Sequence, residues 1–415
     1  MDQRAGKIGP ALKLHRQLAC DWLPCAARST PFGGENIQMT INRRKFSLAA
    51  SGVALASFNI ARAESETKIV LGQSAAFTGP AAQLGIQFYQ GAKVYFDQLN
   101  AHGGVGKRLI EIRNLDDGYE PDCCAENTRK LIADDVFALF GYIGTPNSLA
   151  ALPLATQDKV PFFAPFTGAM ALRAPFNKYV FNIRASYNDE TSVIVKQLSG
   201  LGLKKIAVFY QNDAYGRAGL NGTVLALAAA GLKPVAQATV ERNSVDVAKA
   251  VQALVAAAPD SVVLISAYNA CAAFIREARN VGYGGTFYNV SFVGTQALAD
   301  ALGKDGAGVV VSQVMPSPYN PARPIARDFV EAVKAVGRNA QITFSSMEGY
   351  VAARVFAEGL KRAGAKPSRE SLITGLEAMG SQSIGGFPVS FGPNDHVASN
   401  FVELSMLTGD GRVRT

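Results

Sequence analysis

The chain has 415 residues, of which 48% are hydrophobic, an ordinary apolar content that excludes a disordered chain and leaves room for two lobes. The formal net charge of +8 is concentrated at the N-terminus, because residues 1–63 hold nine Lys/Arg and three Asp/Glu. The remaining 32 basic and 30 acidic residues nearly balance. We therefore expect no basic surface for nucleic acid.

The N-terminal segment carries the features of an export signal. Three basic residues at 43–45 are followed by Phe46, and residues 48–60 form an apolar stretch. Residues 61–63 then follow the small-x-small rule for signal cleavage. An apolar stretch of this length is too short to span a bilayer, which disfavours a membrane anchor. The pattern predicts a cleaved signal and a soluble, periplasmic protein.

Met39 offers a second start, so we expect residues 39–63 to be the signal peptide and residues 1–38 to be an extension upstream of the true start. Paired arginines followed by Phe46 are typical of the twin-arginine route, which exports folded proteins. Asn42 stands where that motif usually has Ser or Thr, which leaves the general secretory route open.

From residue 68 onward, strand-like apolar runs alternate with helical patterns. The strands expected in chain order lie at 68–73, 109–114, 136–141, 161–164, 205–210, 234–240, 261–265, around 286, 309–314, 388–391 and 400–407. The helices expected lie at 83–99, 124–133, 148–157, 189–198, 218–230, 245–257, 270–281, 325–336, 346–363 and 368–379. Two consecutive strand–helix series predict an α/β protein with two doubly wound parallel-sheet lobes. No Ser/Gly-rich linker separates the halves, and residues 315–324 are too rich in proline to be regular.

The turn after the third expected strand has the features of an anion site. Thr145 and Pro146 follow Gly144 where that strand ends and the next helix approaches. Parallel sheets bind ligands at the carboxyl ends of their strands, and free N–H groups at a helix start attract an anion. The alternative is an ordinary N-cap, in which Asn147 or Ser148 satisfies its own backbone.

Further candidate ligand contacts follow other strands. They are Phe166, Thr167 and Gly168 in the turn after the fourth strand, and Tyr187, Tyr215 and Tyr268 near strand ends in or beside the second half. An aromatic ring with a hydroxyl covers an apolar ligand body and still donates a hydrogen bond. We expect the two turns to hold a carboxylate and the tyrosines to cover the rest of a small ligand. The alternative is that these residues are ordinary loop and core residues.

The sequence has no catalytic or nucleotide-binding signature, so we expect neither an enzyme nor a cofactor. A metal site is not expected, because His102 and His396 lack ligand spacing and no Cys-x-x-Cys occurs. The adjacent Cys123 and Cys124 cannot easily bridge each other, whereas a pairing of one of them with Cys271 stays open.

Several segments together resemble the type I periplasmic binding proteins of the leucine/isoleucine/valine family, from about residue 68 to the C-terminus. They are Phe77-Thr-Gly-Pro80, Asn100-Ala-His-Gly-Gly-Val-Gly106, Asp116-Asp117, Phe181-Asn-Ile-Arg184 with Asp189, and Asp213-Ala-Tyr-Gly216. The resemblance implies three crossings between lobe one, at 66–187 plus 314–398, and lobe two, at 188–313 plus 399–415. It also implies a monomer that closes around a small carboxylate, such as a branched-chain amino acid, and docks on the membrane permease of an ABC transporter.

The same resemblance assigns roles to individual residues. Thr145 matches a Ser that binds the ligand carboxylate, Thr167 and Gly168 lie at an amino-acid-binding turn, and Tyr215 and Tyr268 match aromatic ligand contacts. Ser291 stands near the position of the family's acid that neutralises the ligand ammonium, so an aromatic or aliphatic acid is an alternative to an amino acid. A ligand-sensing module for a membrane signalling protein is the alternative function.

Overall fold

The computed structural model describes residues 68–336 and 340–415, so the predicted signal peptide and upstream extension lie outside the described residues. Its first sheet has the strand order β2-β1-β3-β4-β5, and every neighbouring pair is parallel. These strands are β1 (Lys68–Ala75), β2 (Leu109–Asp116), β3 (Ala138–Phe140), β4 (Phe162–Phe163) and β5 (Val180–Phe181). Strands β3, β4 and β5 are apolar and fully buried, as a parallel sheet covered on both faces requires.

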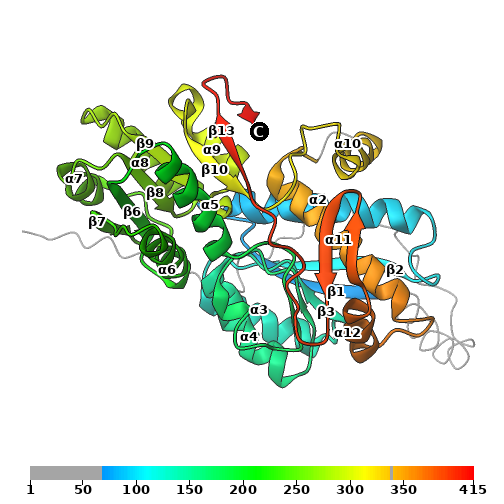
Figure 1. Cartoon of the computed structure of the whole chain (residues 1–415). Helices are drawn as coiled ribbons and strands as arrows, with labels where there is room; N and C mark the ends of the chain where they lie inside the picture. The colour runs from blue at the N-terminus through cyan, green and yellow to red at the C-terminus, as the bar shows by residue number, and fades with distance from the viewer. Residues whose placement is uncertain (1–67, 337–339) are drawn as a thin grey trace, which may run out of the picture. The chain divides into compact units, whose positions relative to one another are not determined.

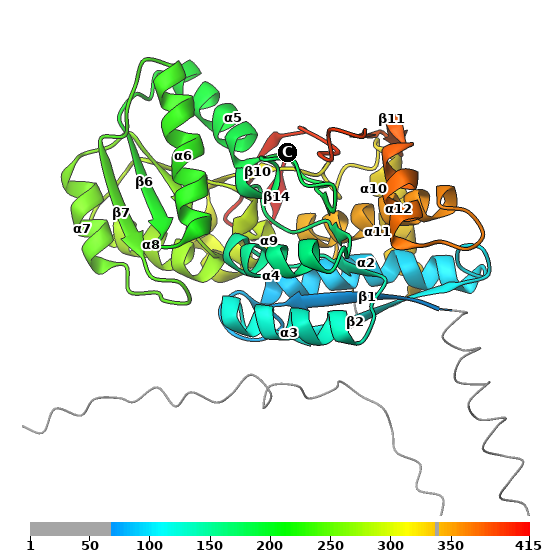
Figure 2. The ribbon, with the colours of Figure 1, turned by 90° about the horizontal axis from the view of Figure 1, so that it is seen from below.

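Helices cover both faces of this sheet, and Figure 2 shows two of them, α2 and α3, on opposite sides of β1. The helices are α2 (Ala82–Ala101), α3 (Pro121–Ala133), α4 (Thr145–Gln157), α10 (Pro324–Val336), α11 (Phe344–Arg362) and α12 (Arg369–Glu377). The α2 and α11 helices pack closely together. Gly91 permits this approach, since a Cβ there would lie 1.7 Å from the Ser346 carbonyl oxygen. This sheet and its helices are the first lobe.

The second sheet has the order β14-β13-β10-β9-β8-β6-β7 (Figure 1). Its strands are β6 (Ile206–Gln211), β7 (Ala236–Val240), β8 (Ser261–Ile265), β9 (Thr286–Asn289), β10 (Val310–Gln313), β13 (Glu403–Leu407) and β14 (Val413–Arg414). Its helices are α5 (Tyr187–Gly200), α6 (Ala214–Ala229), α7 (Ala248–Ala256), α8 (Tyr268–Asn280) and α9 (Thr295–Leu302). This second lobe confirms the predicted α/β class, but β13 and β14 pair antiparallel at one edge.

The chain passes between the two sheets three times, after β5, after β10 and after the β11–β12 hairpin. The first and third crossings lie side by side. Asn182 donates its backbone N–H to the His396 carbonyl at 2.8 Å and accepts from the Ala398 N–H at 2.8 Å. His396 also stacks on Phe181, with ring centroids 3.7 Å apart. The lobe boundaries implied by the family resemblance stay predictions.

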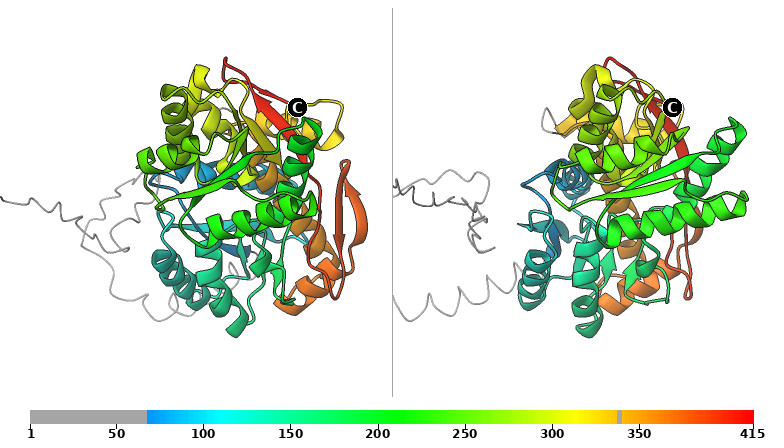
Figure 3. Two further views of the ribbon diagram at one scale, coloured as in Figure 1. Left: turned by 60° about the vertical axis from the view of Figure 1, so that its left-hand side comes forward. Right: turned by 90° about the vertical axis from the view of Figure 1, so that its left-hand side faces the viewer.

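Some elements were not expected from the sequence. They are β5, α9, β14, strand β11 (Gly380–Ile384), and the short 3₁₀ helices η2 (Met170–Leu172), η3 (Ser291–Val293) and η4 (Gly303–Gly306). The expected strand near 388–391 is β12 (Phe387–Phe391), which pairs with β11 in a hairpin apart from both main sheets (Figure 3). These segments are too short, or too polar along one face, for periodicity to reveal them.

Candidate functional site

The α4 helix starts three residues earlier than periodicity predicted, so that Thr145 is its first residue. Gly144 precedes it with a φ of 93°, a left-handed conformation that favours glycine. A Cβ there would also lie 2.3 Å from the Tyr119 ring, which closes the position to larger residues. No side chain among the described residues caps this helix, so the alternative of an Asn147 or Ser148 cap is wrong.

Hydroxyl groups from two neighbouring turns meet at this helix start. Thr145 Oγ1 lies 2.6 Å from Thr167 Oγ1, and both residues are buried. Thr167 Oγ1 accepts from the Ala169 N–H at 3.2 Å and donates to the Tyr187 hydroxyl at 3.3 Å. The turns after β3 and β4 therefore meet at one edge of the first sheet.

The directions of these bonds leave hydroxyl hydrogens for another acceptor. Thr167 has one hydroxyl hydrogen, which it donates to Tyr187, so Thr145 must be the donor in its bond with Thr167. The Tyr187 hydrogen then remains to be donated. The Tyr215 hydroxyl is fully buried and has no hydrogen-bond partner among the described residues. An unsatisfied buried donor of this kind costs about 1–3 kcal/mol, so an added hydrogen-bond acceptor would be stabilised here.

Aromatic rings pack around these hydroxyls. The rings of Tyr187 and Tyr215 lie 5.4 Å apart, and Tyr215 lies 4.4 Å from Phe292. Phe292 also contacts Phe166 at 5.7 Å and Tyr119 at 6.0 Å. Phe292 comes from the second lobe, whereas Phe166 and Tyr119 come from the first. We call Thr145, Phe166, Thr167, Tyr187, Tyr215 and Phe292 the hydroxyl–aromatic cluster; sequence reasoning missed Phe292 and Tyr119.

Burial controls the protonation of the cluster's phenols. Burial raises the pKa of Tyr187 to about 12, although the nearby Arg184 guanidinium acts in the opposite direction. Burial also raises the pKa of Tyr215 well above its usual value. Both phenols are therefore neutral donors at physiological pH. A ligand group that accepts hydrogen bonds, and not one that donates them, complements this end of the site.

A positive charge lies directly behind Thr167. The half-buried Arg173 donates through both terminal nitrogens to the Thr167 carbonyl at 3.2 Å and to further backbone carbonyls, Ala169 and Arg184, at 2.9 Å. Burial and the neighbouring Arg184 lower its pKa to about 10, which still leaves it protonated. Within the described residues, Arg173 forms no ion pair with a carboxylate. Sequence reasoning missed this residue, because an arginine in a loop is unremarkable.

A buried ion pair lies on the other side of Phe166. Arg184 donates through Nε and Nη2 to Glu348 at 2.9 and 3.0 Å, and its guanidinium carbon stacks 4.1 Å from the Phe166 ring centroid. Burial alone would lower the pKa of Arg184, but the Glu348 and Glu190 carboxylates outweigh it and raise the pKa. Both side chains are almost completely buried, and their two parallel hydrogen bonds stabilise the charged forms.

Ser291 lies against a buried acid that the sequence did not reveal. Its N–H and hydroxyl donate to the Glu190 carboxylate at 2.7 and 3.0 Å, and Ser312 adds a third bond at 2.6 Å. Burial raises the pKa of Glu190, while Arg184 and these donors oppose the rise. Three donors fill most of the acceptor positions of one carboxylate. Glu190 is therefore engaged within the protein.

The remaining predicted residues have different positions. Gly168 accepts from the Tyr187 N–H at 2.8 Å, and a Cβ there would lie 2.6 Å from the Tyr187 ring, so it supports the cluster. Pro146 is half-buried at the second position of α4. Tyr268 is not part of the cluster. It is the first residue of α8, and the Gln83 backbone on the first lobe lies beside its hydroxyl.

Several contacts join the lobes around the cluster. Glu120 on the first lobe accepts from Arg242 at 3.0 Å and from the Asn243 side chain at 2.7 Å on the second. Asn269 donates to the Pro80 carbonyl at 3.0 Å, and Gln211 donates to the Tyr119 hydroxyl at 3.3 Å. The lobes are therefore closed on each other in this structure. Entry of a ligand requires them to separate.

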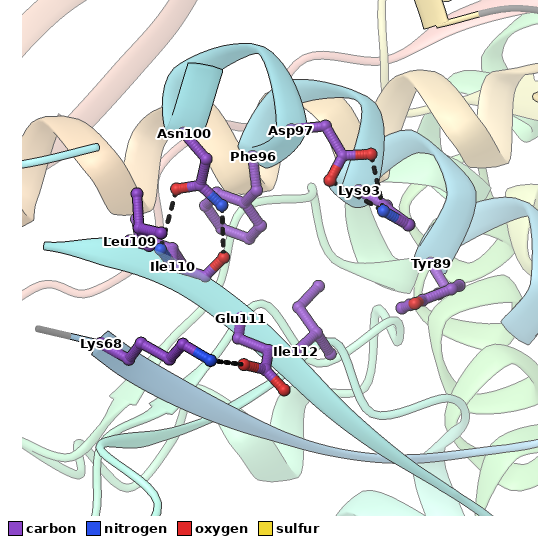
Figure 4. A pocket seen from close by; sticks show the side chains of 10 residues that line it. All are labelled: Lys68, Tyr89, Lys93, Phe96, Asp97, Asn100, Leu109, Ile110, Glu111 and Ile112. Carbon is purple, nitrogen blue, oxygen red and sulfur yellow. Dashed lines mark hydrogen bonds and ion pairs between the residues drawn. The ribbon is translucent and has the colours of Figure 1, made fainter. Parts of the chain in front are cut away.

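A larger pocket of about 260 Å³ lies elsewhere on the first lobe, between α2 and the starts of β1 and β2 (Figure 4). We call it the α2–β2 pocket. Its charges are already paired, Lys68 with Glu111 at 3.5 Å and Lys93 with Asp97 at 2.6 Å. It faces the amino ends of the strands, opposite to the edge where parallel sheets bind ligands. Neither feature favours it as the ligand site.

The disulfide that the sequence left open for Cys271 is not formed. Cys124 and Cys271 are both buried and free, so a disulfide between them is excluded. Burial raises the pKa of both thiols, which makes them unreactive at neutral pH. Of the helices between residues 68 and 336 and from 340 onward, none has the length and apolar content to cross a membrane.

Comparison with known proteins identifies the family. A family model described as "Periplasmic binding protein" matches residues 68–411. Leu/Ile/Val-binding protein homolog 8 of Brucella suis biovar 1 (strain 1330) is 26% identical over 393 residues, covering 88% of this chain and 94% of that protein.

Solved structures agree with this match. A "possible leucine/isoleucine/valine-binding protein" from Rhodopirellula baltica SH 1 aligns with a TM-score of 0.80 and 34% identity, over 84% of this chain and 96% of that one. A substrate-binding periplasmic protein from Ralstonia solanacearum aligns with a TM-score of 0.79 and 32% identity, over 83% and 99%. The chain belongs to the periplasmic binding protein family, within its leucine/isoleucine/valine-binding type.

Proposed function

We propose that this protein is an exported solute-binding protein that closes its lobes around a small carboxylate and delivers it to the membrane permease of an ABC transporter. The observation that carries the proposal is the pair of hydroxyls of Thr145 and Thr167, 2.6 Å apart at an uncapped helix start, with the Arg173 guanidinium behind them. When a ligand binds, the Thr145 hydrogen would turn from Thr167 to the carboxylate, beside the helix N–H groups and near a cation, and these groups stabilise a carboxylate.

The body of the ligand is apolar. The space between the lobes is occupied by the rings of Phe166, Tyr187, Tyr215 and Phe292, which would cover an aliphatic or aromatic group when the lobes close over it. Such contacts are made with both lobes only in the closed state. Ligand binding would therefore favour closure, and closure would change the surface that the permease meets.

An ammonium group on the ligand is less favoured. The acids near the cluster include Glu190, which already accepts three hydrogen bonds, Glu348, which is held by Arg184, and Asp213, which accepts from the N–H groups of Tyr215 and Gly216. A buried ammonium without a free carboxylate partner is costly. We therefore rank carboxylates without an ammonium group, such as aliphatic and aromatic acids, above α-amino acids.

The test is the substitution Thr145→Val, measured by calorimetry with the carboxylate that most raises the melting temperature of the mature chain. Loss of a hydrogen bond to a charged group costs about 1.5–3 kcal/mol, so affinity should fall roughly 10- to 100-fold. Thr156→Val, at the other end of α4, is the matched control and should bind like wild type. If the Thr145→Val protein binds the ligand as tightly as wild type, the ligand carboxylate does not bind at this helix start.

A further inference from the structure

The Arg184 guanidinium has one nitrogen that the protein does not use. Its Nε and Nη2 atoms bind Glu348, but Nη1 is buried without a hydrogen-bond partner among the described residues. A buried guanidinium N–H without an acceptor is among the more costly unsatisfied groups in a protein. Arg184 is 1% exposed, so bulk solvent does not satisfy it.

Arg184 lines a small cavity between the lobes. The cavity has a volume of about 10 Å³, which matches a single water-sized group. Phe166, Ser345 and Glu348 line it from the first lobe, and Ser291 and Gln313 line it from the second. Its walls therefore come together only when the lobes close, and the Phe166 ring connects it to the hydroxyl–aromatic cluster.

The charges around the cavity indicate which group fits. Arg184 and the half-buried Arg173 are matched by Glu190 and Glu348, so these four side chains carry no net charge when all of them are ionised. The ligand carboxylate adds one negative charge beside Thr145. A second negative charge beside Arg184 would find no counter-charge and would lie close to two carboxylates. A neutral oxygen has no such cost and still accepts from Nη1.

We propose that this cavity is a second subsite that recognises a neutral oxygen of the ligand, a carbonyl, hydroxyl or amide oxygen, through Arg184 Nη1. The inference rests on the proposed carboxylate site and adds the substrate class to it: oxygenated carboxylic acids, such as oxo or hydroxy acids. Arg184 then acts as a specificity residue, because an acid without the second oxygen leaves its N–H unsatisfied.

Matched pairs of acids test this subsite on the wild-type protein. The pairs are 4-methylpentanoate with 4-methyl-2-oxopentanoate, 3-phenylpropanoate with phenylpyruvate, and benzoate with 4-hydroxybenzoate. We expect the oxygenated member of at least one pair to bind roughly 10- to 100-fold more tightly in calorimetry. Equal affinity within every pair would overturn the subsite and leave the cavity to a water molecule.

Two variants locate the effect. Ser345→Val fills the cavity without touching the Arg184–Glu348 pair, and the affinity ratio of the discriminated pair should fall to near one. Arg184→Lys keeps the charge but removes Nη1, with the same expected result; if this variant does not fold, Ser345→Val decides. A ratio that survives in Ser345→Val would place the oxygen elsewhere and overturn the assignment.

Failure of the subsite is distinguishable from failure of the carboxylate site. Thr145→Val should weaken both members of a pair equally, because both carry the carboxylate. If it weakens both while neither member is preferred, the carboxylate site stands and the Arg184 subsite fails. If no carboxylate binds the mature chain, both proposals fail together.

Discussion

The hydroxyl–aromatic cluster and the α2–β2 pocket differ in a way that bears on how a ligand site is recognised. The pocket is open and has a volume of about 260 Å³, yet its lysines and acids are paired with each other. The side chains of the cluster are buried, yet the hydrogens of Tyr187 and Tyr215 have no acceptor among the described residues. In a protein that closes around its ligand, unsatisfied buried donors mark the site better than free volume does.

The largest expected effect is a loss of folding stability, which should differ between an ion pair beside the cluster and an ion pair in the α2–β2 pocket. Glu348→Gln leaves Arg184 as an uncompensated buried charge and should destabilise the fold by about 3–5 kcal/mol in urea titrations. Glu111→Gln breaks the exposed pair with Lys68 in the α2–β2 pocket and should cost less than about 1 kcal/mol. Similar losses for the two variants would remove the contrast between the regions.

The buried acid beneath the cluster should make stability depend on pH. Asp117 accepts from Ser74 and from the Tyr119 N–H, and burial raises its pKa from 3.8 to about 6. The folded state then holds a proton that the unfolded state releases. This contribution to stability is complete below pH 4, falls as pH rises towards 6, and is then about 3 kcal/mol lower.

Asp117→Asn tests that dependence, because the amide retains an acceptor oxygen but does not titrate. The difference in unfolding free energy between variant and wild type should grow from pH 4 to pH 6 and then stay constant. Asp134→Asn, which changes an exposed acid paired with Arg113, is the control and should show no such growth. A pH-independent difference for Asp117→Asn would mean that this carboxyl is ionised in the fold.

Two buried tyrosines separate binding from stability. Tyr215→Phe removes an unpartnered hydroxyl, so it should leave the ligand-free protein as stable as wild type, or up to about 1–3 kcal/mol more stable, while weakening ligand binding. The Tyr142 hydroxyl is hydrogen-bonded to Thr128 at 3.1 Å, and Tyr142→Phe should cost about 1 kcal/mol without changing affinity. Loss of stability in Tyr215→Phe, seen in thermal melts, would show that its hydroxyl has a partner.

The smallest effect should come from the contacts that join the lobes at the surface. Glu120→Gln weakens the bond to Arg242, a partly exposed pair, and should lower ligand affinity by up to about fivefold, less at high salt. Asp134→Asn again serves as control, since both partners of its ion pair belong to the first lobe. Scattering curves of Glu120→Gln with ligand that match wild type at every salt concentration would exclude a role in closure.

Much of the fold was predictable, because buried strands and amphipathic helices impose clear periods on the sequence. Helix starts were predicted less well: α4 begins at Thr145 and α8 at Tyr268, earlier than the apolar pattern indicated. The first turn of each helix contacts a segment other than its own sheet, since Thr145 of α4 meets Thr167 and Tyr268 of α8 meets the Gln83 backbone. Its residues therefore do not follow the period that marks the rest of the helix.

The hydroxyl-bearing residues of the candidate site were predictable from the sequence, whereas its buried charged residues were not. Thr145 and Thr167 were expected and lie together, because strand ends of a parallel sheet share an edge. Tyr187 and Tyr215 were also expected and reach the same place from the starts of α5 and α6 on the second lobe. Arg184, Glu348 and Glu190 could not be expected. Arg184 and Glu190 lie 164 and 158 residues before Glu348 in the sequence. Only the packing of the crossings in the tertiary structure brings them to Glu348. Sequence spacing carries no information about such pairs.

The backbone pairing between Asn182 and residues 396–398 has a mechanical consequence. Two of the three connections between the lobes are hydrogen-bonded to each other as one ribbon, so their backbones must rotate together. Independent sliding of the lobes would break those hydrogen bonds, whereas rotation about a single axis through the ribbon preserves them. The lobes should therefore open by a hinge rotation about one axis near Asn182, with the widest gap farthest from this residue.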